Sequence, residues 1–125
     1  MANKNSVSAQ IENILEEYDA DLKKTTNSVM DKVSKESVQK LKNTSPKRSG
    51  EYAKSWTKKK IKGSGGIDTV IVHNKKYQLT HLLENGHIVR NKKGTYGRTS
   101  GIKHIAPVEE WAIDEFPAEI ERELK

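Results

Sequence analysis

The longest pattern in the chain is an apolar stripe at helical spacing over residues 7–41. Its members recur at spacings near three and four, which places them on one face of an α-helix. They are Val7, Ile11, Ile14, Leu15, Tyr18, Leu22, Val29, Met30, Val33 and Leu41. A helix of this length spans roughly 50 Å at about 1.5 Å per residue, which exceeds the diameter of its own domain. Either part of the helix projects to meet neighbours or it breaks at residues 25–27, and we expect an unbroken or gently bent helix.

A proline and a glycine-rich turn divide the next stretch. Pro46 ends the long helix, because residues before a proline avoid the α conformation. Residues 50–55 have room for one helical turn, and residues 56–62 then alternate as a half-exposed strand. The β-branched run at residues 67–73 is its partner strand, since residues 63–66 are a turn rich in glycine. The pattern predicts an antiparallel β-hairpin.

A short central helix is predicted for the stretch Tyr77–His87. Its apolar face consists of Leu79, Leu82 and Leu83. Asn85 and Gly86 provide the left-handed residue that ends such a helix. Glu84, beside them, is either a buried carboxylate that fixes the following loop or a surface charge at the helix end.

Beyond this helix the chain is basic and rich in glycine before a second long helix begins. We predict short strands at residues 88–90 and 103–105, on either side of a long mobile loop at residues 91–101. Pro107 suits the first turn of a C-terminal helix, whereas Pro117 is expected to kink that helix or restart it. The apolar face of this helix consists of Trp111, Phe116, Ile120 and Leu124.

These elements together predict an α+β protein with a single domain over residues 1–125. The long N-terminal helix (residues 1–44) and the C-terminal helix (residues 107–125) are expected to pack on a small antiparallel sheet. Residues 45–106 supply the hairpin, the short central helix and the long loop.

The composition leaves little material for a core. Only 33% of the 125 residues are hydrophobic and 32% are charged, so we expect partners to cover part of the apolar surface. The chain has neither a run of about 18 apolar residues nor the apolar core of a signal peptide, which predicts no membrane partner. The lack of cysteine excludes disulfides and thiolate chemistry and fits a reducing compartment such as a bacterial cytoplasm.

The net charge of +6 is unevenly distributed. Residues 35–62 hold ten basic residues against two acidic ones, residues 75–104 hold seven against one, and both ends of the chain are acidic. A fold that separates these segments has a positive surface suited to nucleic acid, or to head-to-tail packing of identical subunits. A solvated surface that keeps the protein soluble explains the pattern equally well.

The basic residues of the predicted hairpin and loop are the most informative binding candidates. The hairpin contributes Lys58, Lys59 and Lys60. The loop contributes Lys92, Lys93, Tyr96 and Arg98. We expect the hairpin lysines to contact DNA phosphates in a channel or an acidic partner, and the loop residues to contact a neighbouring subunit or partner. Aromatic side chains among them are few, so base stacking has weak support.

Other candidate chemistry has little support from spacing. The histidines are His73, His81, His87 and His104. Their spacing matches no zinc motif, and residues 94–101 lack the Gly-Lys-Ser/Thr end of a phosphate loop. No Ser/His/Asp order and no paired carboxylates stand out. We therefore predict no catalytic, metal or cofactor site.

Four segments carry a recognisable order. They are Ser45–Pro46, Ser49–Trp56, Tyr77 with Leu83–Gly86, and His104–Ala112. Placed after a long helix, they resemble the tail-completion, or head–tail joining, family of long-tailed bacteriophages. The resemblance indicates Gly50, Tyr77, Glu84, Gly86 and Pro107 as structural-motif residues. Two positions depart from the family pattern: Tyr52 stands where leucine is usual, and Trp111-Ala112 stands where Pro-Ala is common.

The resemblance implies a structural protein without enzymatic activity or cofactor. Such proteins assemble as rings, commonly hexameric, in the virion neck between head-closure proteins and the tail terminator or tail tube. Double-stranded DNA would pass through the ring without sequence-specific contact. The expected partners are therefore copies of the chain itself and adjoining neck proteins, in a virion assembled in the cytoplasm of a bacterial host.

Two other functions stay open from the residues alone. A small basic ribonuclease-like toxin would use His81, His87 or His104 as acid or base and Arg90 or Arg98 on phosphate. Loss of RNA cleavage on His104→Ala would favour this function. A DNA-binding accessory protein would instead bind with an affinity that falls steeply with salt.

Overall fold

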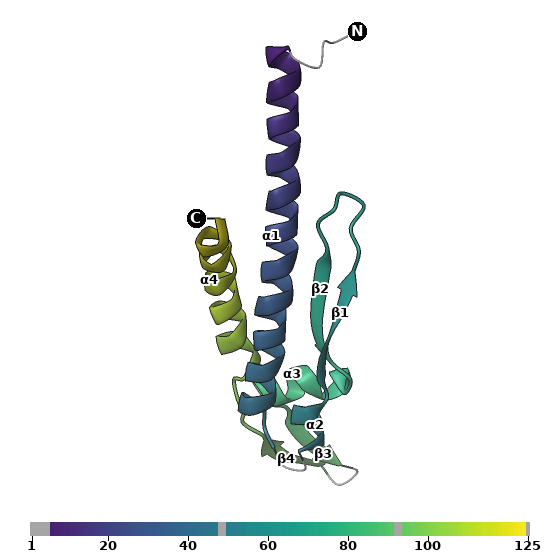
Figure 1. The fold of residues 1–125 in the computed structure, drawn as a ribbon. Coiled ribbons are helices and arrows are strands. Elements are labelled where there is room, and N and C mark those ends of the chain that lie inside the picture. Colours follow the sequence, from purple (N-terminus) through teal and green to yellow (C-terminus); the bar gives the residue numbers. More distant parts are fainter. Residues whose placement is uncertain (1–5, 48–49, 92–93, 125) are drawn as a thin grey trace.

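The computed structural model describes residues 6–47, 50–91 and 94–124. Within these ranges the elements are α1 (Val7–Thr44), α2 (Glu51–Lys54), β1 (Trp56–Ile61), β2 (Thr69–Asn74), α3 (Tyr77–Asn85), β3 (Ile88–Asn91), β4 (Gly94–Arg98) and α4 (Ile105–Leu124). β1 pairs with β2 and β3 pairs with β4, each as a two-stranded antiparallel sheet. The predicted α+β class is confirmed (Figure 1).

Helix α1 is a single unbroken helix of 38 residues, as the apolar stripe predicts. The Ser6 side chain caps its start by accepting a hydrogen bond from the backbone N–H of Ala9 at 3.1 Å. The backbone N–H of Ser45 closes its end on the carbonyl of Leu41, and Pro46 follows. At about 1.5 Å per residue, α1 is roughly 57 Å long. Its N-terminal part extends beyond every other labelled element (Figure 1).

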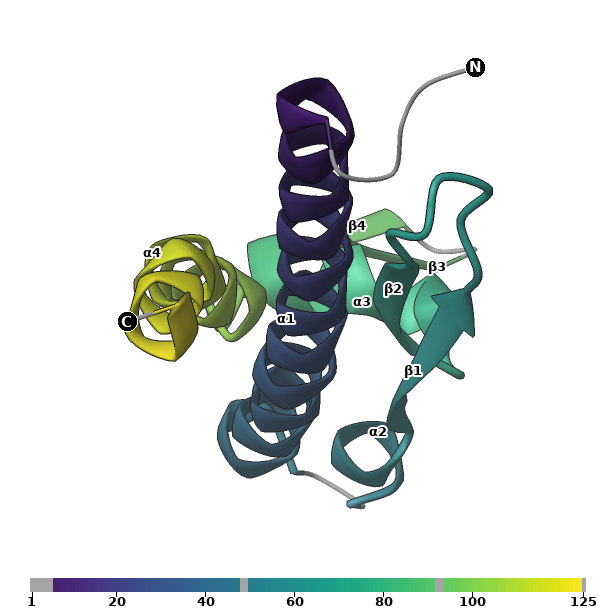
Figure 2. The same ribbon diagram turned by 45° about the horizontal axis from the view of Figure 1, so that its top comes forward.

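Helix α4 runs along one side of α1 in the opposite direction (Figures 1 and 2). The Lys32 Nζ lies 2.6 Å from Glu119 Oε1, and the Lys40 Nζ lies 4.5 Å from the ring centroid of Trp111. The hydrogen bond from Lys32, together with Arg122, lowers the pKa of the Glu119 carboxyl to about 2. Two contacts at different positions along α1, one an ion pair and one a cation–π contact, therefore hold α4 against its C-terminal half.

The β1–β2 hairpin lies on the other side of α1 (Figures 1 and 2). Its register runs from Trp56 opposite Asn74 to Ile61 opposite Thr69, so the partner strand begins slightly later than predicted. Near its tip, Asn27 holds both the Gly66 carbonyl, through Nδ2 at 2.8 Å, and the Asp68 N–H, through Oδ1 at 2.9 Å. The hairpin is thereby fixed against α1.

The core lies where α2, β1 and α4 meet the C-terminal end of α1. Its buried apolar side chains are Leu41, Tyr52, Trp56 and Val108. Val38, Val72, Leu83 and Ile105 pack against them and are partly buried. A core of this size covers only the lower part of the molecule in Figure 1, and it leaves the far end of α1 without a partner in the described chain.

Two predictions for the stretch after α3 are wrong. Part of the loop predicted at residues 91–101 is strand β4, which pairs with β3 from Asn91 opposite Gly94 to Ile88 opposite Arg98. Gly94 and Gly97 adopt positive φ angles of 136° and 114°, which other residues rarely adopt. The glycines of this stretch therefore permit an irregular hairpin, although glycine-rich stretches are often loops. The strand predicted at residues 103–105 does not form, because Ile105 begins α4.

The C-terminal helix continues through its internal proline. Pro107 lies in the first turn of α4, as predicted, and Pro117 lies inside the same helix, so the alternative of a restarted helix is wrong. Pro117 cannot donate to the carbonyl of residue 113 one turn earlier. Ile113 is 63% exposed, so this turn of the helix faces solvent.

Candidate functional site

A buried carboxylate joins the end of α3 to the start of α4. Glu84 Oε1 accepts hydrogen bonds from the backbone N–H groups of His104 and Ile105 at 2.6 and 2.8 Å. Its Oε2 accepts the N–H of Ala106 at 3.0 Å. N–H groups at a helix start have no carbonyl partner within the helix, so Glu84 acts as the cap of α4 from a distant position in the chain. Glu84 is therefore the buried carboxylate of the two predicted alternatives, not a surface charge at the helix end.

Two glycines allow the chain to cross itself at this junction. Gly86 has a φ of 80°, and a Cβ added there would lie 2.2 Å from the Thr99 carbonyl oxygen. A Cβ on Gly101 would lie 2.3 Å from the Glu84 carbonyl oxygen. The prediction of a left-handed residue at this position is wrong in part: the φ of Gly86 is positive, but its ψ of 172° lies outside the left-handed helical region. The direct backbone contact brings Glu84 within reach of α4.

His104 is enclosed between Glu84 and the aromatic core. Its side chain has no exposed surface, and its Nδ1 lies 2.7 Å from the Ile102 carbonyl oxygen and 3.0 Å from Glu84 Oε1. Its Nε2 lies 2.8 Å from the Tyr52 hydroxyl. The rings of Tyr52, Trp56 and His104 meet edge to face, with centroids 5.5–6.3 Å apart. Tyr52 thus supplies a hydroxyl that the leucine usual at this position lacks, and the hydroxyl satisfies His104.

Glu84 and Tyr52 each keep one charge state near neutral pH. Burial alone raises the pKa of Glu84, but the N–H groups of Ile105, His104 and Ala106 outweigh it and lower that pKa. Burial raises the pKa of Tyr52, although a hydrogen bond involving Thr80 partly offsets this. Glu84 is therefore an anion and Tyr52 a neutral phenol, a pair suited to holding structure rather than exchanging protons.

The three histidines proposed for a ribonuclease-like site have different surroundings. His81 and His87 are exposed, as is His73, whereas His104 is fully buried and its ring cannot reach a substrate. The Nδ1 of His87 lies 3.0 Å from the Thr99 hydroxyl, beside the β3–β4 hairpin. In the part of the chain that the structure describes, no group of three or more metal-ligating side chains comes together.

The predicted basic residues occupy two separate places. Lys58 Nζ donates to the Asp31 carbonyl and to Ser34 Oγ, both at 3.2 Å, and Lys60 pairs with the Asp31 carboxylate at 3.0 Å. These two lysines therefore fasten β1 to α1, and Lys59 is exposed on the opposite face of the strand. Arg98 is exposed and ends β4, a strand that lies at the base of the molecule in Figure 1.

The other loop candidates are Lys92, Lys93 and Tyr96. Lys92 and Lys93 lie outside the described residues. Tyr96 lies within β4, of which the backbone is described. The strands that carry the described candidates, β1 and β4, belong to separate sheets.

The remaining structural-motif residues lie at the ends of elements. Gly50 has a φ of 82° and precedes α2, and Tyr77 begins α3 with 70% of its surface exposed. Pro107 lies in the turn of α4 that Glu84 caps. Each of these three residues lies at or near the start of a helix.

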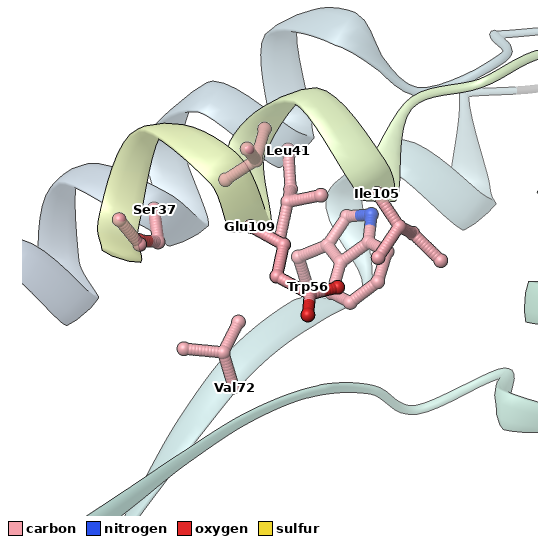
Figure 3. A pocket seen from close by; sticks show the side chains of 8 residues that line it. Ser37, Leu41, Trp56, Val72, Ile105 and Glu109 are labelled. Atoms are coloured by element: carbon pink, nitrogen blue, oxygen red, sulfur yellow. The ribbon is translucent and has the colours of Figure 1, made fainter. Parts of the chain in front are cut away.

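An apolar trough opens between α1, β2 and α4. Figure 3 shows side chains from all three elements around the Trp56 ring. Its lining is mainly apolar, from Leu41, Val72, Ile105, Val108 and Ala112, and Ser37 and Glu109 are its polar lining residues. The trough is open to solvent on the surface of the core.

A second apolar surface lies on the projecting segment of α1, which we define as residues 7–21. Every residue from Gln10 to Asp21 is exposed. The exposed fractions of its large apolar side chains are Val7 71%, Ile11 51%, Ile14 64%, Leu15 60% and Tyr18 62%. Exposed apolar side chains in such a continuous stripe mark interaction surfaces in soluble proteins.

Sequence reasoning missed the polar contacts that join distant elements. The Tyr52–His104 and Lys32–Glu119 contacts join residues 52 and 87 positions apart. No spacing rule reports such pairs. The contact of Glu84 with α4 had a signal in the sequence. Glu84 lies two residues before Gly86, and the prediction already included the alternative that Glu84 is a buried carboxylate that fixes the following loop.

The comparison with known protein families identifies the chain. The family described as "Bacteriophage HK97-gp10, putative tail-component" matches residues 9–86, more than half of the sequence. The chain belongs to this family. The HK97-gp10-like match covers α1, the β1–β2 hairpin and α3, and it ends at the glycine where the chain crosses itself. No curated protein and no solved structure matches the chain.

Membership of the HK97-gp10-like family makes the chain a structural component of the bacteriophage tail and places it in the virion. It also confirms the resemblance to phage tail-completion proteins. No helix among the described residues has both the length and the apolar character needed to cross a membrane.

Proposed function

We propose that this tail component forms a homo-oligomeric ring in the phage neck, hexameric like the rings that the resemblance implies. The ring joins the DNA-filled head to the tail and surrounds the DNA channel, without catalysing a reaction. The observation that carries this proposal is the exposure of the projecting segment of α1, where Ile14 and Tyr18 are more than half exposed. An apolar helix end of this kind is covered in an assembly and is costly in a free monomer.

The two ends of the molecule fit two kinds of partner. The acidic projecting segment lies at one end and the β3–β4 hairpin at the other (Figure 1). We propose that the hairpin, through Lys92, Lys93, Tyr96 and Arg98, contacts a neighbouring subunit or the next ring. The proposed neighbours are head-closure or adaptor proteins on one side and the tail terminator or tail tube protein on the other, assembled in the cytoplasm of the bacterial host.

Among the hairpin lysines, Lys59 is the one we propose for DNA in the channel or for an acidic partner. Lys58 and Lys60 fasten β1 to α1, and Lys59 is exposed on the other face. A phosphate contact of this kind carries no sequence information and weakens with salt. The channel would therefore let double-stranded DNA pass rather than hold a particular sequence.

The proposal is tested by removing the protein from the phage. Lysates of a mutant without this chain are expected to contain DNA-filled heads and separate tails under the electron microscope. Supplying the wild-type chain from a plasmid is expected to restore joined particles. Normal joined particles without the chain, or heads that lack DNA, would contradict a joining role.

Replacing Lys92, Lys93 and Arg98 together by alanine tests the contact proposed for the β3–β4 hairpin and keeps the backbone of both strands. The variant is expected to fold, as far-UV circular dichroism would show, and to leave heads and tails unjoined in the complementation assay. The Gln78→Ala variant, at an exposed position of α3, serves as a comparison, because it alters no residue of that hairpin. Normal joining with the triple variant would remove these side chains from the interface and leave the ring itself untouched.

A further inference from the structure

The projecting segment of α1 has a defined chemistry for its partner. Residues 6–22 carry five carboxylates and no lysine or arginine. They are Glu12, Glu16, Glu17, Asp19 and Asp21. Asp19 pairs with Lys23 at 2.9 Å, just beyond this stretch. The surface that covers the apolar stripe must therefore combine apolar side chains with flanking positive charges.

Pairing of two projecting segments with each other does not meet this requirement. Side by side, two copies would bring both sets of carboxylates together without cations between them. Like charges beside a helical apolar seam are destabilising, in contrast to the opposite charges that select coiled-coil partners. A different surface of the chain must be the acceptor.

A groove with the required chemistry lies along the C-terminal half of α1. It runs between α1, α2 and β1 as two adjoining hollows that share Lys42. The lysines that line it are Lys35, Lys42, Lys47, Lys54 and Lys58. Its apolar lining comes from Val38, Ala53 and Trp56. No carboxylate of the described residues lines this lysine-rimmed groove.

The other hollows fit an acidic helix less well. The apolar trough has Glu109 in its lining. The hollow between α1 and the end of α4 includes Asp21 and Glu123. Either site would place the carboxylates of the projecting segment near another carboxylate. The hollow beside β2 and α3 is lined by no lysine or arginine, so charge selects the lysine-rimmed groove.

We propose that the projecting segment of one copy docks in the lysine-rimmed groove of the next copy. This inference rests on the proposed self-assembly and names the contact that produces it. The two surfaces lie on different halves of α1, so the contact is head-to-tail and every copy offers both partners. A contact of this type closes into a ring when its rotation is suitable.

The dimensions of the two surfaces agree. The carboxylates from Glu12 to Asp21 span roughly 14 Å along the helix. The part of the groove on α1, from Lys35 to Lys42, spans roughly 10 Å, and the hollow at α2 extends it. Ile14 and Tyr18 would contact the apolar lining and the aliphatic stems of the lysines, while the carboxylates meet the ammonium groups.

Disulfide trapping tests this contact, because the chain has no cysteine of its own. Ile14→Cys places a thiol on the projecting segment, and Gln39→Cys places one in the groove. Within one copy these positions are roughly 37 Å apart along the rigid helix. A disulfide requires Cα atoms within about 7 Å, so it forms only between copies. Mixing the two single variants under mild oxidation is expected to give mainly the mixed dimer.

The matched control replaces the groove position by Ile113→Cys on α4, which is 63% exposed and outside the groove. Its mixture with Ile14→Cys is expected to give little cross-linked product. Dominant Ile14–Ile14 dimers, or cross-linking to Ile113, would overturn the inference. Oligomers that form without an Ile14–Gln39 cross-link would overturn it too, and would leave the proposed ring intact.

A charge reversal gives a second, non-covalent test. Lys35→Glu with Lys42→Glu is expected to weaken self-association by roughly tenfold or more at low salt. Adding Glu12→Lys and Glu16→Lys to the partner copy is expected to restore it. An unchanged dissociation constant, absence of rescue, or a wild-type chain that stays monomeric at all concentrations would overturn the docking. The mutant-phage assay decides the joining role separately.

Discussion

The two halves of α1 share one apolar pattern and meet different surroundings. In the C-terminal half, Val29, Val33 and Leu41 are 2–6% exposed against α4 and the core. In the projecting segment, Val7 and Leu15 are at least 60% exposed. Helical periodicity therefore predicts which face is apolar, whereas tertiary structure decides whether the chain itself covers that face.

The same comparison separates folding from assembly. The base of the molecule satisfies its own polar groups, and in the described residues no buried side-chain nitrogen or oxygen lacks a hydrogen-bond partner. The projecting segment contributes helix but hardly any burial. Substitutions in the base should therefore change the free energy of unfolding, and substitutions in the projecting segment should change association.

The largest stability effect is expected at the cap of α4. Glu84→Ala removes the acceptor of three backbone N–H groups, one buried and two partly buried, and should lower the free energy of unfolding by about 3 kcal/mol. Urea denaturation followed by circular dichroism measures this. Glu12→Ala, on the projecting segment, should change the same quantity by less than about 0.5 kcal/mol. Equal losses at the two glutamates would remove the distinction between the two halves.

A smaller effect is expected from the hydroxyl that contacts His104. Tyr52→Phe leaves the Nε2 of a fully buried ring without its partner at 2.8 Å, which should cost about 1–2 kcal/mol in the free energy of unfolding. Tyr18→Phe is the matched control, since Tyr18 is 62% exposed on the projecting segment. Thermal unfolding of both variants measures the difference, and a stable Tyr52→Phe protein would argue against a structural role for this hydrogen bond.

Acid sensitivity should also come from the base. The pKa of Glu119 is lowered from 4.5 to about 2, first by the Lys32 hydrogen bond and then by Arg122. A lowered folded pKa means that the stabilisation is complete above the unfolded pKa of 4.5 and is lost as the pH falls toward about 2. Glu119→Gln should therefore lower stability at neutral pH and flatten its decline over this window.

The control for this pH effect is Glu12→Gln on the projecting segment, which should leave the acid limb of the stability curve unchanged. Unfolding midpoints at a series of pH values measure both variants. A wild-type decline that persists undiminished in Glu119→Gln would assign the acid sensitivity to other groups.

Sequence patterns predicted the elements that local spacing determines. The stripe from Val7 to Leu41 predicted α1. The alternation at residues 56–62, the turn at residues 63–66 and the β-branched run after it predicted the β1–β2 hairpin. Strand β4 escaped prediction because glycine content is typical of loops and of irregular hairpins alike. The strand predicted at residues 103–105 failed because the cap of α4 comes from Glu84, far away in sequence.

Less of the candidate site could be predicted. Lysines at residues 58–60 carry no signal that two of them fasten β1 to α1, since Asp31 is distant in the chain. The lysine-rimmed groove is likewise assembled from α1, α2 and β1, so no single stretch encodes it. The sequence predicted a projecting segment only from the length of the helix, which exceeds the diameter of its domain. Which residues project depends on where the other elements end.

The central claim is that the projecting segment serves association and contributes little to folding. Sedimentation velocity of the wild-type chain and of Ile14→Ser with Leu15→Ser tests it most directly. The wild type should form oligomers of the 14.1 kDa chain, and the double variant should stay monomeric with a nearly unchanged free energy of unfolding. A double variant that assembles like the wild type, or that unfolds as readily as a core variant, would contradict the claim.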